Sequence, residues 1–516
     1  MPKHFPPKTL KNLAFENIIK NVDAVWTAKY VKDWGDKHLM YVEGPFDCLT
    51  PPDCHWILSE LAMRRILKKH HIYLLINPYL KILNLSDFRD ASKIKLILDL
   101  ALTRCQNLKK IVLKFSQDFS TLFMPYLEIL NNLTELELPN TRLNNHDVGL
   151  IGIHAANVRL LNLMDTRFSD NGLRCLFLPV DPEGNPDDAY GQCQKVEMLD
   201  IRGVEITPEC AAQIYSHRKD KWAMFRVDKT FNVIMACLEN YEIENFKTDY
   251  VSFSTLENDE IKLEGYVQAA LVLAKGASDI HLYDLDSEEQ KDGEGLSLVQ
   301  HFPKVTSLTL DIRQDFKANP LSTDYVFEKG ITPILFNHGQ NLTFIMFTFV
   351  KDLDLGLLAS CCSSLEQLRL QFNIYSNITT KFEVDPHWPL KNLVIQCCSH
   401  PAVGILSNSP EEPVFKKILA GAKNLESFVV SYCRTFTDEV IVQASQVNPF
   451  DKLTHFMITN CKNITMKALE GALLMKNEVP LINILFFGCD QITLADYNRY
   501  KRYIETNHFK VQVQWQ

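Results

Sequence analysis

The chain has 516 residues, of which 46% are hydrophobic, and it carries a formal net charge of −9. This acidic balance argues against a general binder of nucleic acid or of anionic membrane surfaces. No apolar run reaches the roughly 18 residues of a membrane-spanning helix, and the opening residues lack the apolar core of a signal peptide.

Residues 1–78 contain no internal repeat and are predicted to form helices. Thr9 precedes an apolar stripe at Leu10, Leu13 and Ile18. A threonine followed by apolar residues on one face is typical of a capped amphipathic helix. This pattern predicts a first helix that begins near Thr9.

A second helix is predicted to open at Pro51 and Pro52, because proline is favoured in the first turn of a helix. Its apolar stripe comprises Ile57, Leu58 and Leu61, and a basic helical stretch follows at 63–76. One interpretation is structural. Repeat stacks need a cap over their first coil, and terminal units are atypical, so residues 1–78 could be a plain cap.

The rest of the chain repeats a Leu-x-x-Leu-x-Leu pattern, most copies of which start about 23 to 28 residues apart, as is typical of a leucine-rich repeat. Longer gaps follow the copies at 158, 305 and 390, where the added residues are expected to form loops. Thirteen repeats begin at Leu80, Leu108, Leu133, Val158, Val196, Ile280, Val305, Leu342, Leu365, Leu390, Leu425, Leu453 and Leu481. The interval 204–279 is irregular. It holds either one or two eroded copies, with a candidate strand near Trp222, or an insertion.

The last three copies end in Cys433, Cys461 and Cys489, which are 28 residues apart. Alternation in the copy that starts at Leu453 turns Phe456 and Ile458 inward, and a helix is predicted after the cysteine at 466–475. These copies resemble the cysteine-containing subclass of leucine-rich repeats, with Cys398 as a looser fourth member. Because the 14 cysteines are spread through repeat cores, we expect reduced thiols and a cytoplasmic or nuclear protein.

The predicted fold class is α/β: a leucine-rich repeat solenoid (horseshoe) with a concave parallel sheet, convex helices and an N-terminal helical module. We expect a helical module at 1–78 and a repeat domain at 79–516. The repeat domain would end in a cap at 496–516, a helix followed by an alternating strand. That strand is predicted to lie beside the last repeat and to leave the concave face open.

Side chains that lie between the inward leucines are expected to face the concave side. In the C-terminal copies this gives a contiguous apolar surface, which often marks a partner site. The residues predicted to bind a partner there are Val394, Val429, His455, Met457, Leu485 and Phe487.

The segment Thr9–Ile18 resembles the elongin-C-binding box of the von Hippel–Lindau protein and the SOCS-box family. Thr9, Leu10 and Ile18 match that box in register, and Ala14 stands where the family has cysteine. The sequence from Leu49 onward resembles the cullin-selecting box that follows it in those proteins. The resemblance implies adaptor binding through Thr9, Leu10, Leu13, Ala14, Ile18, Leu49, Pro51, Pro52, Ile57 and Leu58.

Residues 46–76 also resemble a diverged F-box. Both resemblances imply one function: a substrate-recognition subunit of a cullin–RING ubiquitin ligase. Its partners would be elongin C and B or an F-box adaptor, a cullin, and an unknown target on the concave face. The alternative is a non-catalytic repeat scaffold in which residues 1–78 are a plain cap.

The sequence contains no phosphate-binding glycine loop and no catalytic motif with its expected spacing. His70 and His71 lie in a basic stretch and are interpreted as surface residues. His55, near Cys48 and Cys54, is interpreted as a helix-packing residue, because metal sites need three or four converging ligands. We therefore expect no enzyme activity, no cofactor and no metal.

Overall fold

The computed structural model describes residues 10–39, 42, 44–88, 90–114, 131–241, 243, 245–254, 263–286, 294–313, 326–375, 388–397, 409–466, 483–506 and 512–515. The chain forms two compact units. One lies within His4–Thr248 and the other within Asp249–Gln516, and each is described by itself. Thr9, Cys398 and most of the predicted helix 466–475 lie outside the described residues.

The N-terminal unit begins with helices. They are α1 (Leu10–Lys20), a π-helical turn at Val22–Trp26, α2 (Ala28–His38), α3 (Pro51–Met63) and α4 (Lys69–Leu75). Helix α3 opens at Pro51, as predicted.

The prediction of one basic helix at 63–76 is wrong. Helix α3 ends at Met63, and Arg65 takes a left-handed conformation with φ 57°. The N–H groups of Ile66 and Leu67 both donate to the Leu61 carbonyl at 3.0 and 3.1 Å, which closes the helix end. The chain restarts as α4 only at Lys69.

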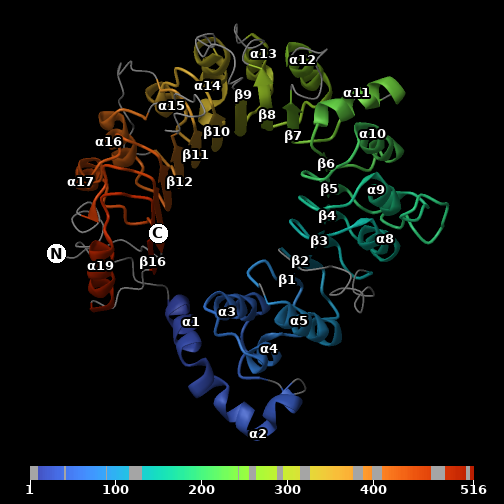
Figure 1. The fold of residues 1–516 in the computed structure, drawn as a ribbon. Helices are drawn as coiled ribbons and strands as arrows, with labels where there is room; N and C mark the ends of the chain where they lie inside the picture. The colour runs from blue at the N-terminus through green and yellow to red at the C-terminus, as the bar shows by residue number, and fades with distance from the viewer. Residues whose placement is uncertain are drawn as a thin grey trace. The chain divides into compact units, whose positions relative to one another are not determined.

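The same unit contains a six-stranded parallel sheet in the order β1-β2-β3-β4-β5-β6, with helices on one side of the strands (Figure 1). The strands are β1 (Ile82–Asn84), β2 (Lys110–Val112), β3 (Glu135–Glu137), β4 (Leu160–Asn162), β5 (Met198–Asp200) and β6 (Met224–Arg226). The helices are α5 (Ala91–Arg104), α8 (Asn145–His154), α9 (Asp170–Phe177), α10 (Pro208–His217) and α11 (Thr230–Asn240).

The C-terminal unit contains a ten-stranded parallel sheet in sequence order from β7 to β16. Its strands are β7 (Tyr250–Ser254), β8 (Asp279–Asp286), β9 (Ser307–Arg313), β10 (Phe344–Thr348), β11 (Gln367–Gln371), β12 (Asn392–Gln396), β13 (Ser427–Ser431), β14 (His455–Thr459), β15 (Asn483–Phe487) and β16 (Gln512–Trp515). Its α-helices are α12 (Leu263–Leu273), α13 (Glu294–Ser297), α14 (Thr332–His338), α15 (Leu355–Cys361), α16 (Glu412–Gly421), α17 (Asp438–Val447) and α19 (Leu494–Thr506). Short 3-10 or π-helical turns lie at Leu298–His301, Val326–Ile331 and Gly339–Asn341.

The predicted leucine-rich repeat fold is confirmed, since a strand follows twelve of the thirteen predicted repeat starts and β8 contains the other one, Ile280. The irregular interval 204–279 contains two further strands, β6 and β7. The core is built as expected: Leu453, Phe456, Ile458 and Cys461 are all buried. Phe456 and Ile458 lie directly beside the equivalent residues of β13 and β15.

Polar links join successive coils at the start of their helices. Asp438, the first residue of α17, accepts the backbone N–H of Thr465 from the next coil at 2.8 Å. The same link joins Thr207 to Asp170 in the N-terminal unit, also at 2.8 Å. A carboxylate at a helix N-terminus is favoured by the helix dipole, so these contacts stabilise both the helix and the stack.

The cysteines line the turn between strand and helix. Cys461 and Cys489 lie 3.5 and 3.7 Å from the carbonyl oxygens of Thr459 and Phe487, consistent with weak donation by buried thiols. The neighbour of Cys433 in this ladder is Cys397, with 2.9 Å between the sulfur atoms. The preceding coil therefore contributes Cys397 to the ladder. The predicted fourth member, Cys398, lies outside the described residues.

The C-terminal end of the sheet is closed by β16, which pairs in parallel with β15 as predicted. Trp515 stacks on Tyr497 of α19, and its indole N–H donates to the Ile492 carbonyl at 3.1 Å. Within the described residues, none of the helices has the length and apolarity that crossing a membrane requires.

Candidate partner-binding surfaces

Helix α1 presents apolar side chains to solvent. Leu10 is 84% exposed and Leu13 50% exposed, and Ala14 is exposed beside them. Residues three and four positions apart share a helix face, so these three side chains form one surface. Ile18 is buried and anchors the helix instead.

Helix α1 is held in place by α3. Lys11 forms an ion pair with Asp53 at 2.6 Å, and the rings of Phe15 and Trp56 stack at 5.1 Å. The surface made by Leu10, Leu13 and Ala14 is therefore presented by a helix whose opposite side is packed.

The other residues predicted to bind an adaptor differ in exposure. Pro52 is exposed, whereas Leu49 and Pro51 are half-buried. Ile57 and Leu58 are fully buried within the N-terminal unit, so they support α3 from beneath and contribute no surface area. The exposed part of this set is thus Leu10, Leu13, Ala14 and Pro52.

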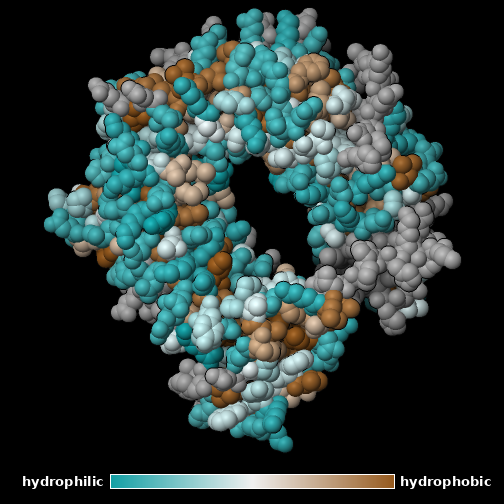
Figure 2. All heavy atoms as spheres, turned by 180° about the vertical axis from the view of Figure 1, so that it is seen from behind, coloured by the Kyte–Doolittle hydropathy of each residue, from teal (hydrophilic) through white to brown (hydrophobic). Residues whose placement is uncertain are grey.

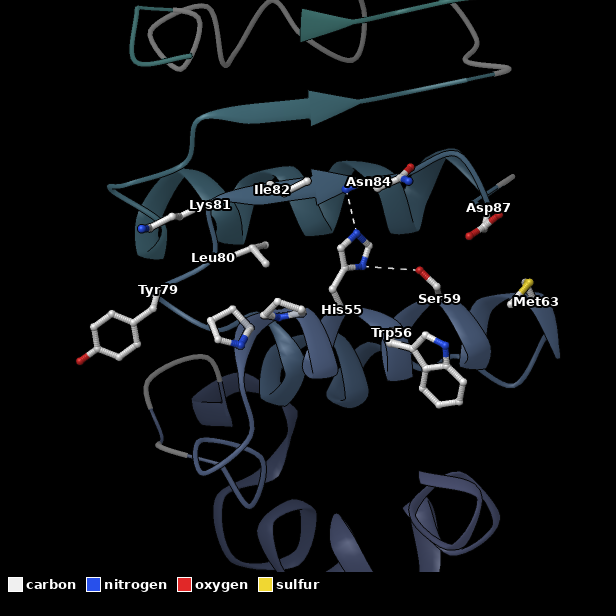
Figure 3. Close-up of a pocket in the computed structure, with 12 residues that line it drawn as sticks. His55, Trp56, Ser59, Met63, Tyr79, Leu80, Lys81, Ile82, Asn84 and Asp87 are labelled. Atoms are coloured by element: carbon white, nitrogen blue, oxygen red, sulfur yellow. Dashed lines mark hydrogen bonds between the residues drawn. The ribbon is translucent and has the colours of Figure 1, made fainter. Parts of the chain in front are cut away.

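A groove of about 730 Å³ lies between α3 and the edge strand β1 (Figure 3). Its exposed apolar lining comprises Trp56, Met63, Tyr79 and Ile82. Sequence reasoning missed these residues because they come from two segments some distance apart in the chain. A signal did exist, since Trp56 and Met63 are seven residues apart and therefore share a helix face.

His55 covers part of the open edge of β1. Its Nε2 accepts the backbone N–H of Asn84 at 2.8 Å, and its Nδ1 lies 3.5 Å from the Ser59 hydroxyl, as Figure 3 shows. Because Nε2 accepts, the ring is neutral with its proton on Nδ1, and burial lowers the pKa of His55. His55 thus packs α3 against β1, as expected, and it protects an unpaired strand edge.

Asp23, His70 and His71 place three possible metal ligands within 4.8 Å of one another. One Asp23 oxygen lies 3.0 Å from Nε2 of His70 and 2.9 Å from Nε2 of His71, while the other accepts from Lys68 at 2.7 Å. The interpretation of both histidines as surface residues is wrong for His71, which is fully buried.

The protonation of His71 does not fit a metal site. Its Nδ1 accepts the Lys68 backbone N–H at 3.1 Å, so Nε2 carries the proton that points at Asp23. A metal on Nε2 would move that proton to Nδ1, where it would face another donor. We therefore assign the group to hydrogen bonding that fastens the π-helical turn to α4.

Burial lowers the pKa of His71 from 6.5 to about 4, despite the opposing effect of Asp23. Burial alone would raise the pKa of Asp23, but hydrogen bonds from Lys68, His70 and His71 hold it well below its usual range. At neutral pH Asp23 is therefore a carboxylate and His71 is neutral.

This arrangement leads to a pH prediction. The unfolded chain binds a proton at His71 near pH 6.5, and the folded chain does so only near pH 4. The free energy of unfolding should therefore fall as pH drops through that window, by on the order of 2 kcal/mol, because each pKa unit corresponds to about 1.4 kcal/mol. Urea unfolding between pH 7.5 and 4.5 measures this loss. His71→Asn should reduce the slope and His70→Asn should keep it; an unchanged slope in His71→Asn would refute the assignment.

The concave face of the C-terminal unit has the predicted apolar surface. Val394, Val429, Met457 and Leu485 are direct partners across β12, β13, β14 and β15. We call these four residues the central row. All four are half-buried, whereas His455 and Phe487 are exposed on either side of the row.

The central row has different neighbours at its two ends. At one end Val394 pairs with Arg369 of β11, which is exposed and lies 5.7 Å from the Phe344 ring. At the other end Leu485 pairs with Gln514 of the closing strand β16. The apolar surface is therefore bounded by a cation on one side and an amide on the other.

No protein-family model and no curated protein matches the sequence. Among solved structures, the chain is similar to an internalin from Listeria monocytogenes, with 12% identity, a TM-score of 0.34, and 82% of this chain and 93% of that chain covered. It is similar to a leucine-rich repeat protein from Leptospira interrogans, with 14% identity, a TM-score of 0.31, and coverage of 81% and 91%. It is also similar to a chain of the yeast Rad7–Elc1 complex, with 13% identity, a TM-score of 0.37, and coverage of 98% and 97%. At these scores the likenesses carry no argument about function.

Proposed function

We propose that this chain is a non-catalytic substrate-recognition subunit of a cullin–RING ubiquitin ligase. Its N-terminal helices would bind an adaptor of the elongin C class through Leu10, Leu13 and Ala14. Its concave repeat face would bind the target protein. The chain would promote ubiquitin transfer only by proximity, because it would hold the target near a ubiquitin-charged enzyme. The proposal places the protein in the cytoplasm or nucleus.

One observation carries the proposal: exposed apolar side chains are concentrated in residues 10–82, which contain the N-terminal helices and the first strand. About half of the large exposed apolar side chains among the described residues lie between Leu10 and Ile82, roughly a seventh of the chain. Figure 2 shows brown side chains among these helices, in the lowest part of the view. A plain cap needs apolar residues only on the side that covers the first coil, so outward-facing ones favour a partner.

The alternative is a repeat scaffold with a plain cap. It is favoured by the burial of Ile57 and Leu58 and by the contact of His55 with the edge strand. These contacts explain the inner side of α3. They do not account for Leu10 and Leu13.

Binding of the full-length chain to purified elongin B–C, measured by calorimetry, tests the proposal. Leu10→Asp should weaken binding by roughly 100-fold, because losing a buried leucine costs about 1.5–3 kcal/mol before the aspartate is desolvated. Ala14→Cys restores the residue of the resembled box and should tighten binding several-fold. The matched control is Val272→Asp on α12, where the wild-type side chain is 61% exposed and lies in the other unit.

The same titration with the F-box adaptor separates the two resemblances. If neither adaptor binds the wild-type chain or Ala14→Cys, the ligase proposal fails and the scaffold alternative stands. If binding occurs but Leu10→Asp and Val272→Asp behave alike, the adaptor binds elsewhere than on α1.

A further inference from the structure

The spacing of the central row restricts what can lie along it. Adjacent strands of a sheet are about 4.8 Å apart, so four consecutive strands span about 14 Å. A helix rises about 1.5 Å per residue, so its side chains at positions i, i+3, i+7 and i+10 span about 15 Å along one face. Alternate side chains of an extended segment span about 20 Å over the same four contacts. A helix therefore matches the row and an extended segment does not.

Apart from the exposed Phe487, the side chains that flank the central row are polar, and they carry no fixed charge. On the side where the strands begin lie Asn392, Ser427, His455 and Asn483, and on the other side lie Gln396, Ser431, Thr459 and Phe487. A charged partner side chain buried against either flank would lose hydration without gaining an opposite charge. The matching helix thus has a narrow apolar stripe with uncharged polar residues beside it.

Arg369 adds a charge at one end of the row. Its pairing with Val394 continues the line of the four apolar side chains, and its guanidinium is exposed. A carboxylate on the partner that reached this position would form a charge-assisted hydrogen bond. Charge complementarity therefore favours a partner helix with an acidic residue at the end that lies near Arg369.

We propose that the concave face of β12–β15 binds an amphipathic α-helix of a partner protein, laid across the strands. Its apolar residues at i, i+3, i+7 and i+10 contact Leu485, Met457, Val429 and Val394, or the same residues in reverse order. An acidic residue at its end pairs with Arg369. This inference rests on the proposed function, which assigns target binding to the concave face. It adds that the bound part of the target is an amphipathic helix with an acidic end.

The probe is a fluorescent, side-chain-stapled 14-residue peptide with leucine at those four positions, glutamine and serine elsewhere, and glutamate at one end. Two versions place the glutamate at either terminus, so that both orientations are sampled. Fluorescence anisotropy with the full-length chain should show at least tenfold tighter binding for one version than for an unstapled peptide with two central prolines. Met457→Lys should weaken binding at least tenfold. Arg369→Glu should weaken the glutamate peptide and strengthen a lysine-ended one.

Val272→Lys is the matched control and should leave the affinity unchanged, and Met457→Gln serves if Met457→Lys lowers the melting temperature. Equal binding of the proline peptide, retained binding by both Met457 variants, or failure of both stapled versions to bind would overturn the inference. These outcomes are independent of elongin B–C binding through Leu10. Adaptor binding can thus be disproved while helix binding to the concave face is supported, and helix binding can be disproved while adaptor binding is supported.

Discussion

Replacement of Asn448 by alanine is expected to lower the free energy of unfolding of the C-terminal unit by about 3 kcal/mol. Asn448 is 1% exposed and lies where the chain leaves α17. Its Nδ2 donates to the carbonyls of Leu419 and Ala422 at 2.7 and 2.9 Å, and its Oδ1 accepts the Phe450 N–H at 3.0 Å. Alanine leaves these buried groups without the amide, at a cost of about 1–3 kcal/mol for each unsatisfied group.

The two carbonyls belong to the end of α16 in the preceding coil, so Asn448 joins neighbouring repeats as well as capping a helix. Urea unfolding followed by circular dichroism measures the change. Asn463→Ala is the control, because its exposed amide makes one bond across coils, to the Arg434 carbonyl at 2.7 Å. The control should lose less than about 1 kcal/mol. A comparable loss of unfolding free energy in both variants would mean that burial of the amide does not determine how much its removal destabilises the protein.

The sequence pattern located the repeats because the positions that repeat are the ones that stack. The inward residues Leu453, Phe456 and Ile458 are buried, and so are their equivalents one copy earlier, Leu425, Phe428 and Val430. Because apolar residues are needed at the same positions of each copy, the sequence shows a visible period. The central row followed from the same alternation. Once Phe456 and Ile458 point inward, Met457 must point to the opposite face of the sheet.

The same pattern was lost across 204–279 for a physical reason. The core near β6 is aromatic: Tyr215 stacks on Phe246 at 4.2 Å, and Trp222 meets Phe225 edge-on at 5.0 Å. The buried Arg218 guanidinium lies 4.7 Å from the Trp222 ring. Large rings fill the space that leucines fill elsewhere, so a search for leucine spacing does not recognise the coil.

The candidate surfaces show a second limit of sequence reasoning. An apolar stripe identifies which residues share a face, but not what that face meets. Leu10 and Leu13 face solvent, while Ile57 and Leu58 on a similar stripe are buried. The groove between α3 and β1 depends on contacts between residues far apart in the chain, such as His55 with Asn84, and these have no local signature.

Gly152→Ala is expected to destabilise the N-terminal unit, although glycine-to-alanine changes inside helices usually stabilise by up to about 1 kcal/mol. Gly152 lies in α8, where a Cβ atom would collide with the carbonyl oxygen of Cys175 and come 2.9 Å from its carbonyl carbon. Both are backbone atoms of α9, so relief requires the two helices to separate. Overpacking of this kind costs about 1–3 kcal/mol, and a backbone obstacle places the loss at the upper end.

The matched control is one helical turn earlier in α8. At Gly149 the nearest atoms to an added Cβ are side-chain atoms, with Tyr190 Cε1 at 2.9 Å and Pro182 Cγ at 3.1 Å. These can move without shifting a helix, so Gly149→Ala should change the free energy of unfolding by less than about 1 kcal/mol. Thermal and urea unfolding of both variants measure the difference. A Gly152→Ala chain as stable as wild type would show that α8 and α9 are further apart than the structure places them, and would remove close backbone contact as the basis of this stack.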